Sequence, residues 1–131
     1  MIASQEYNNV SPNDIAFNNQ LLNLLKELHR LYPNDSDIAL LNKTVFLATT
    51  TCERKPRKMF KKYMKKYEKY IENRDETFFL TYEGYLSQMN ATDWSLILIK
   101  KLKSMWLNMS LETHKSIWLY LNVLLKLTKR A

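Results

Sequence analysis

Glycine and proline are scarce in this chain of 131 residues, which has one glycine, Gly84, and three prolines, Pro12, Pro33 and Pro56. Tight β-hairpins depend on glycine-containing turns, so this composition argues against a fold of many strands. Long stretches without either residue favour helices. With a single glycine, the chain also has no glycine-rich phosphate-binding loop of the GxGxxG or P-loop kind.

Cysteine is nearly absent, with Cys52 alone, which excludes an internal disulfide framework and a cysteine-rich zinc site. The most apolar stretch, 117–127, is interrupted by Asn122 and Lys126 and is too short to span a bilayer. Residues 1–11 are polar and contain no apolar core of a signal peptide. We therefore expect an intracellular protein, in the cytoplasm or the nucleus, without an integral membrane segment.

Residues that could carry catalysis do not form a recognisable motif. His29 and His114 are the only histidines, and neither stands in a metal-binding spacing. No nucleophile motif surrounds Cys52, so an inert thiol is the simpler interpretation. We predict that the protein has no catalytic residues, no metal site and no cofactor, and that it is not an enzyme.

Apolar periodicity and helix caps predict an all-α fold, a compact single-domain bundle of five or six helices. The expected helices are 12–31, a second from about Ser36, a third over 56–73, a short fourth over 75–80, a fifth from a cap at Thr92 to about Asn108, and a last from a cap at Ser110 to about Lys129. Residues 1–11 are expected to form a flexible arm and residues 12–131 the helical domain. The expected core residues are Leu25, Leu28, Phe60, Tyr67, Trp94, Leu98, Leu102, Trp106, Trp118, Leu121 and Leu125.

The third predicted helix separates apolar from basic residues almost completely. At 100° per residue, its methionines and aromatics share one side and its cations the other. Between Arg54 and Tyr70 there are nine cations and one acid, Glu68, so this segment carries +8 whereas the whole chain carries +7. The candidate polyanion-binding residues are therefore Arg54, Lys55, Arg57, Lys58, Lys61, Lys62, Lys65, Lys66 and Lys69.

Several functions fit such a basic face. Lysines along a helix can contact a phosphate backbone and release counterions without reading sequence, and lysine in place of arginine indicates point-charge attraction. The tyrosines lie on the opposite side, so a base-stacking platform is not indicated. A nuclear localisation patch, adsorption to an anionic membrane, or a merely solvated face remain open alternatives. Our first hypothesis is a non-catalytic protein that binds nucleic acid or another polyanion.

The second hypothesis is a structural or adaptor protein, such as an assembly component, that binds an acidic protein surface. It predicts an exposed apolar patch, which we place around Phe78, Phe79, Tyr82 and Tyr85. Faces rich in methionine and tyrosine suit interfaces, so a homodimer is compatible with the sequence, although nothing requires one.

Four segments together carry a resemblance to a known group of proteins. They are LLKELHRLYPNDSD at 24–37, the basic helix followed by DETFFL at 75–80, LKSMWLNM at 102–109, and IWLYLNVLLKL at 117–127. Their combination resembles small helical proteins of unassigned function from large nucleocytoplasmic DNA viruses, over about residues 20–129. The resemblance implies no functional residues. It implies a location in the host cytoplasm, in a viral factory, or in the virion.

Overall fold

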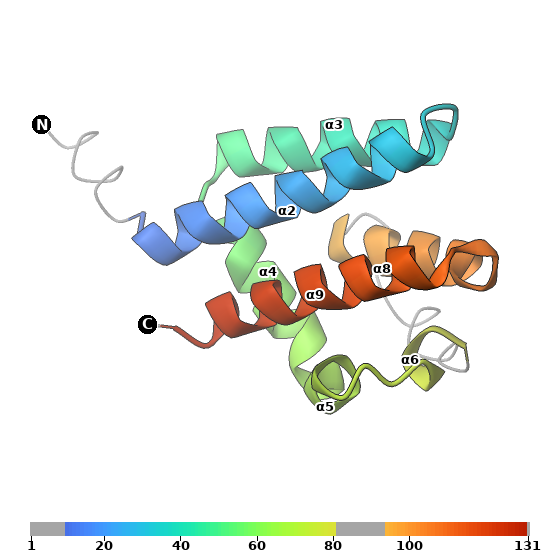
Figure 1. Ribbon diagram of the computed structural model, residues 1–131. Helices are drawn as coiled ribbons and strands as arrows, with labels where there is room; N and C mark the ends of the chain where they lie inside the picture. Colours follow the sequence, from blue (N-terminus) through green and yellow to red (C-terminus); the bar gives the residue numbers. More distant parts are fainter. Residues whose placement is uncertain (1–9, 81–93, 131) are drawn as a thin grey trace, which may run out of the picture.

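The protein is an all-α bundle, as the sequence predicts (Figure 1). The computed structural model describes residues 10–80 and 94–130. Its helices are α2 (Pro12–Leu31), α3 (Ser36–Thr51), α4 (Lys55–Met64), α5 (Glu68–Glu72), α6 (Thr77–Leu80), α8 (Trp94–Met105) and α9 (Leu111–Thr128), with 3₁₀ turns η1 (Lys65–Tyr67) and η2 (Trp106–Asn108). Most of the predicted arm and the predicted cap at Thr92 lie outside the described residues. None of the helices in the described residues is long and apolar enough to cross a membrane.

Side-chain caps explain why three helices begin where the sequence predicts. Ser11 and Asp14 form a capping box at the start of α2, in which each side chain accepts a hydrogen bond from the backbone amide of the other. Asp35 accepts two amide hydrogen bonds at the start of α3, and Ser110 accepts one at the start of α9. These caps satisfy amides that have no partner inside their own helix.

The predicted helix 56–73 is not continuous. The 3₁₀ turn η1 separates α4 from α5, and its tighter winding changes the direction in which the following side chains project. The segment ends at Asn73 and Arg74, where Arg74 adopts a left-handed backbone with φ of 50°. Neither proline nor glycine marks the interruption or the end, so the usual signals for a kink are absent from the sequence.

The core lies between α2, α4, α8 and α9. In Figure 1, α2 runs antiparallel to both α3 and α9, and α4 crosses the bundle. All eleven predicted core residues are buried. Phe60 of α4 joins two parts of this core, because its ring lies 5.4 Å from that of Phe17 and 6.5 Å from that of Trp94, centroid to centroid. The apolar face of α4 is thereby fixed inward.

Three asparagines on otherwise apolar faces connect the helices. Asn18 donates its side-chain amide to the carbonyl of Glu53. Asn42 donates to the carbonyl of Leu25 in α2, and Asn122 donates to that of Ile71 in α5. Each bond joins two segments that are distant in the sequence. They explain why a polar residue interrupts the apolar stretch 117–127.

Candidate nucleic-acid interface

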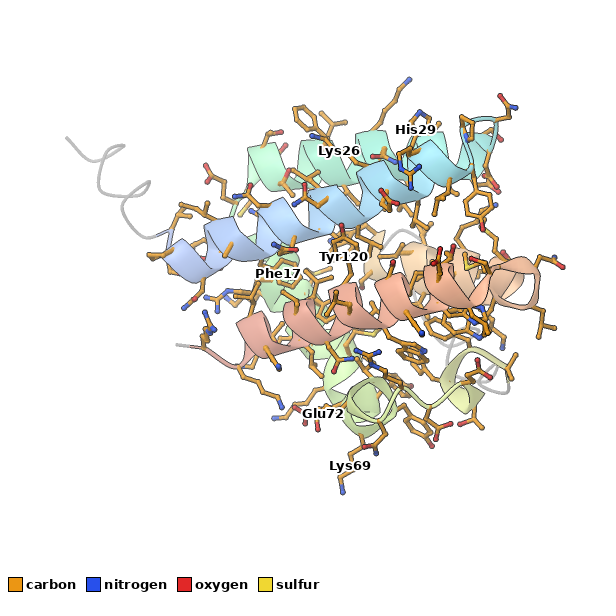
Figure 2. The ribbon with its side chains drawn as sticks, in the orientation of Figure 1. Phe17, Lys26, His29, Lys69, Glu72 and Tyr120 are labelled. Carbon is orange, nitrogen blue, oxygen red and sulfur yellow. The ribbon has the colours of Figure 1, made fainter. Side chains whose placement is uncertain are left out.

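Eight of the nine predicted cations lie exposed along one side of α4, η1 and α5. We call them the basic ridge: Arg54, Lys55, Lys58, Lys61, Lys62, Lys65, Lys66 and Lys69. The ridge faces outward because the opposite side of the segment is buried through Phe60, Met64, Tyr67 and Ile71. Figure 2 shows Lys69 projecting away from the body of the protein at the α5 end.

The positive charge of the ridge is not neutralised by its neighbours. Among the described residues, no ridge cation forms an ion pair. The nearby acids Glu68 and Glu72 are instead held by Lys129, whose Nζ lies 2.5 Å and 2.7 Å from their carboxylates. Hydrogen bonds to Glu68 and then Glu72 raise the pKa of Lys129 above its ordinary value. Over residues 10–80 and 94–130, the ridge is therefore a row of cations without a paired acid.

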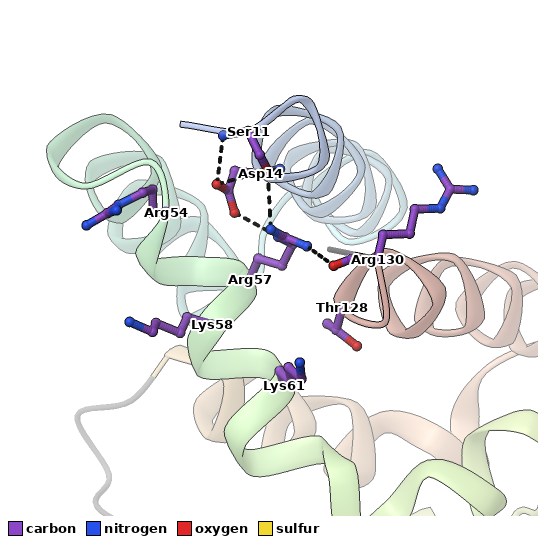
Figure 3. A pocket seen from close by; sticks show the side chains of 8 residues that line it. All are labelled: Ser11, Asp14, Arg54, Arg57, Lys58, Lys61, Thr128 and Arg130. Atoms are coloured by element: carbon purple, nitrogen blue, oxygen red, sulfur yellow. Dashed lines mark hydrogen bonds and ion pairs between the residues drawn. The ribbon is translucent and has the colours of Figure 1, made fainter. Parts of the chain in front are cut away.

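Arg57 does not belong to this surface, so its predicted place among the exposed cations is wrong. Its guanidinium donates from Nε to Asp14 Oδ1 at 2.7 Å and from Nη2 to Ser11 Oγ at 3.2 Å. Its Nη1 donates to the carbonyl of Leu127 at 3.0 Å and to that of Arg130 at 2.9 Å (Figure 3). We call this set the Arg57 clamp. Arg57 points toward α2 and α9 because four acceptors lie there, in α2, in α9 and next to their ends. A helical projection of α4 alone does not show these acceptors.

The clamp is largely shielded from solvent. The side chains of Arg57 and Asp14 are 15% and 7% exposed. Burial by itself raises the pKa of Asp14, but hydrogen bonds from Arg57 and Ser11 and the charge of Arg57 outweigh it, so the pKa of this carboxyl lies below its ordinary value. Asp14 is thus a carboxylate at neutral pH, and the clamp is a bridge between α2, α4 and the end of α9.

The ridge meets the clamp at a hollow of ≈ 400 Å³. Its lining includes Arg54, Lys58 and Lys61 of the ridge and Arg57 and Asp14 of the clamp. In Figure 3, Arg54 and Lys58 point away from the clamp toward the outer side of α4. Their charges are accordingly available to solvent, whereas that of Arg57 is already bound.

The predicted apolar patch is not exposed where the structure describes it. Phe78 and Phe79 are 0% and 1% exposed, so their assignment to a protein interface is wrong. Phe78 packs 5.5 Å from the ring of Tyr67, and Phe79 stacks 4.2 Å from that of Trp106. The short helix α6 closes one end of the core with these two rings. Tyr82 and Tyr85 lie outside the described residues.

The two histidines and the cysteine are the remaining side chains that could react. His114 is held by contacts within the protein. The ring of His114 stacks on Trp106 at 3.8 Å, and its Nε2 lies 2.7 Å from the Trp106 carbonyl oxygen. His29 and Cys52 are exposed, and Cys52 caps the end of α3. Over residues 10–80 and 94–130, no group of three or more His, Cys, Asp or Glu side chains could hold a metal ion.

Comparisons with protein-family models, with curated proteins and with solved structures found no match for this chain. The resemblance to helical proteins of large DNA viruses therefore stays a prediction. Any functional conclusion has to come from the geometry of the chain itself, and the basic ridge is its most strongly charged feature.

Proposed function

We propose that this protein is a non-catalytic binding protein whose basic ridge engages nucleic acid, or another polyanion, without sequence specificity. One observation supports this most directly: eight exposed cations share one side of a segment fixed to the core, and no described acid pairs with them. Binding along such a surface releases counterions from the phosphate backbone, which provides the driving force.

The length of the ridge suits a phosphate backbone. From Lys55 to Lys69 the segment rises about 1.5 Å per residue, so the ridge is about 20 Å long. A B-DNA strand places one phosphate per about 3.4 Å of axis, so about six phosphates fit that length. Lysine dominates the ridge, with Arg54 its single arginine, and base reading relies on arginine, asparagine and glutamine aimed into a groove. The contacts we propose are therefore with phosphates.

Binding of duplex DNA and single-stranded RNA across a salt series tests the proposal. We expect micromolar binding at low salt, with a slope of log K against log salt of about −3.6 to −5.4 on duplex DNA for four to six neutralised phosphates. The variant Lys61→Glu/Lys65→Glu/Lys69→Glu should bind at least about a hundredfold more weakly, because it reverses three charges of the ridge.

A charge-matched control separates the ridge from the net charge of the protein. The variant Lys26→Glu/Lys115→Glu/Lys126→Glu changes three exposed lysines on α2 and α9, so it lowers the net charge from +7 to +1 as the ridge variant does. We expect it to retain most of the affinity at physiological salt, where exposed charges more than about 8 Å apart are screened. Equal losses in the two variants, or no binding by the wild type at low salt, would refute the proposal.

A further inference from the structure

Helix α3 carries an apolar stripe on its solvent side. Leu40 and Leu47 are 65% and 62% exposed, and with Thr44 and Thr51 they occupy positions separated by four, three and four residues. That spacing places the four side chains on one face of a helix. The hydroxyls of Thr44 and Thr51 donate back to the carbonyls of Leu40 and Leu47, so the stripe offers few free polar groups. Large exposed leucines at helical spacing are typical of docking surfaces.

The stripe borders a groove that runs between α3 and its neighbours α8 and α4. A hollow of ≈ 310 Å³ lies beside Leu40 and Ile97, a second of ≈ 370 Å³ lies beside Leu47 and Trp94, and a third of ≈ 570 Å³ continues beside Met59. Thr44 lines both the first and the second hollow. Cys52, Lys55 and Met59 line both the second and the third. We call the three together the α3 groove.

The charges around the α3 groove are almost all positive. Among the described residues that line it, the cations are Arg54, Lys55, Lys58, Lys62, Lys100 and Lys101, and the single acid is Asp37. Lys101 holds that acid at 3.1 Å and Asp35 at 2.8 Å. Five cations therefore remain along an apolar groove with no unpaired acid among its lining residues. This charge disfavours a second copy of the chain, which carries +7, and favours an acidic occupant.

We propose that the α3 groove docks an acidic amphipathic helix of a partner protein. Apolar residues of that helix, spaced three and four apart, would pack against Leu40, Leu47 and Ile97, as in other complexes of a helix in a groove. Its flanking carboxylates would meet Lys55, Lys58 and Lys100, which adds electrostatic complementarity and selects against basic helices. The inference concerns a surface with an apolar component and does not depend on nucleic-acid binding by the ridge.

A synthetic peptide provides the probe. It is a fluorescein-labelled helix of about three heptads, with leucine at the two apolar positions of each heptad and glutamate or alanine elsewhere. A second peptide replaces the leucines by serine, and a third replaces glutamate by lysine. In about 0.5 M salt, where exposed charges are strongly screened, we expect the full-length protein to bind the leucine–glutamate peptide at least about tenfold tighter than the serine peptide. In about 0.05 M salt, where screening is weaker, we expect it to bind the leucine–glutamate peptide at least about tenfold tighter than the lysine peptide.

Two charge-neutral variants locate the site. Leu40→Ser/Leu47→Ser should lower the affinity for the leucine–glutamate peptide about tenfold or more, because it truncates two central apolar anchors. The control Leu107→Ser/Leu111→Ser changes two leucines that are even more exposed but lie outside the groove, and it should bind as the wild type does. Circular dichroism and thermal unfolding check that both variants fold, which is expected for exposed positions.

Three results would overturn the proposal. Equal affinity for the leucine and serine peptides would mean that charge alone attracts them. Equal loss in the groove variant and its control would place the binding elsewhere. The third result is that the wild type sediments as a dimer and the Leu40→Ser/Leu47→Ser variant as a monomer, which would identify a second copy of the chain as the occupant. Nucleic-acid binding measured on the same two variants reports separately on the ridge, which neither substitution touches.

Discussion

Replacing Arg57 by alanine should destabilise the protein more than replacing any cation of the basic ridge. The substitution removes four hydrogen bonds and leaves Asp14 as a shielded carboxylate without its cation. Removing one partner of a buried ion pair costs about 3–5 kcal/mol, and a single hydrogen bond to a charged group contributes about 1.5–3 kcal/mol. Because Arg57 is 15% exposed and hydrogen bonds at one group are not additive, we expect a loss of about 2–4 kcal/mol.

Urea unfolding followed by circular dichroism measures this loss, and Arg54→Ala is the matched control. Arg54 lies three residues earlier on the same segment, is exposed, and makes no side-chain cap hydrogen bond. Its replacement should change the free energy of unfolding by less than about 0.5 kcal/mol. If Arg57→Ala and Arg54→Ala cost the same within error, Arg57 is an ordinary surface cation and the reasoning about the clamp is wrong.

The difference in free energy of unfolding between wild type and Arg57→Ala should depend on pH, and this dependence tests whether Asp14 is the partner of Arg57. The folded-state pKa of Asp14 is lowered, so its ionisation contributes stability that is fully present above the unfolded pKa of about 3.9 and is lost as the pH falls through the folded pKa. The gap in free energy of unfolding between wild type and Arg57→Ala should therefore be largest near neutral pH and narrow below about pH 4. A gap that stays constant down to about pH 2 would exclude Asp14 as the source.

Two further substitutions test the roles assigned to α6 and α9. Phe78→Ala should lower the free energy of unfolding, measured with denaturant, by about 3–5 kcal/mol, as expected for a buried aromatic ring. A change below about 1 kcal/mol would mean that Phe78 lies on the surface. Lys129→Ala releases Glu68 and Glu72 beside the ridge. It should weaken DNA binding in a low-salt titration by more than the same substitution at Lys126, and equal effects would show that pairing of these acids is irrelevant to the ridge.

The sequence predicts the fold well where local signals decide it. Pro12, Ser36 and Ser110 mark the helix starts that the structure shows, because caps and first-turn residues act over a few neighbouring amides. The predicted core residues are buried because periodicity at 3.6 residues reports which side of a helix is apolar. Such signals are contained within each helix and need no knowledge of its neighbours.

The predictions that the structure contradicts concern residues whose position is decided by contacts with residues distant in the sequence. Arg57 lies on the basic side of its own helix, and its acceptors are 43 to 73 residues away, so no local pattern indicates that it is bound. Phe78 and Phe79 follow a charged stretch and resemble an exposed patch, yet they complete the core against η1, η2 and α9. The periodicity of α3 likewise places Leu47 on the buried side, whereas the structure leaves it 62% exposed, since the sequence does not show which apolar residues remain uncovered.

The separations within the Arg57 clamp also bear on the order of folding. Its bonds join positions 43, 46, 70 and 73 residues apart, and contacts that close such long loops form late because of their entropic cost. Interactions absent from the transition state act mainly on the unfolding rate. In stopped-flow experiments, Arg57→Ala should therefore speed unfolding and leave the folding rate nearly unchanged. The clamp would then act as a latch that closes on an assembled bundle and slows its reopening.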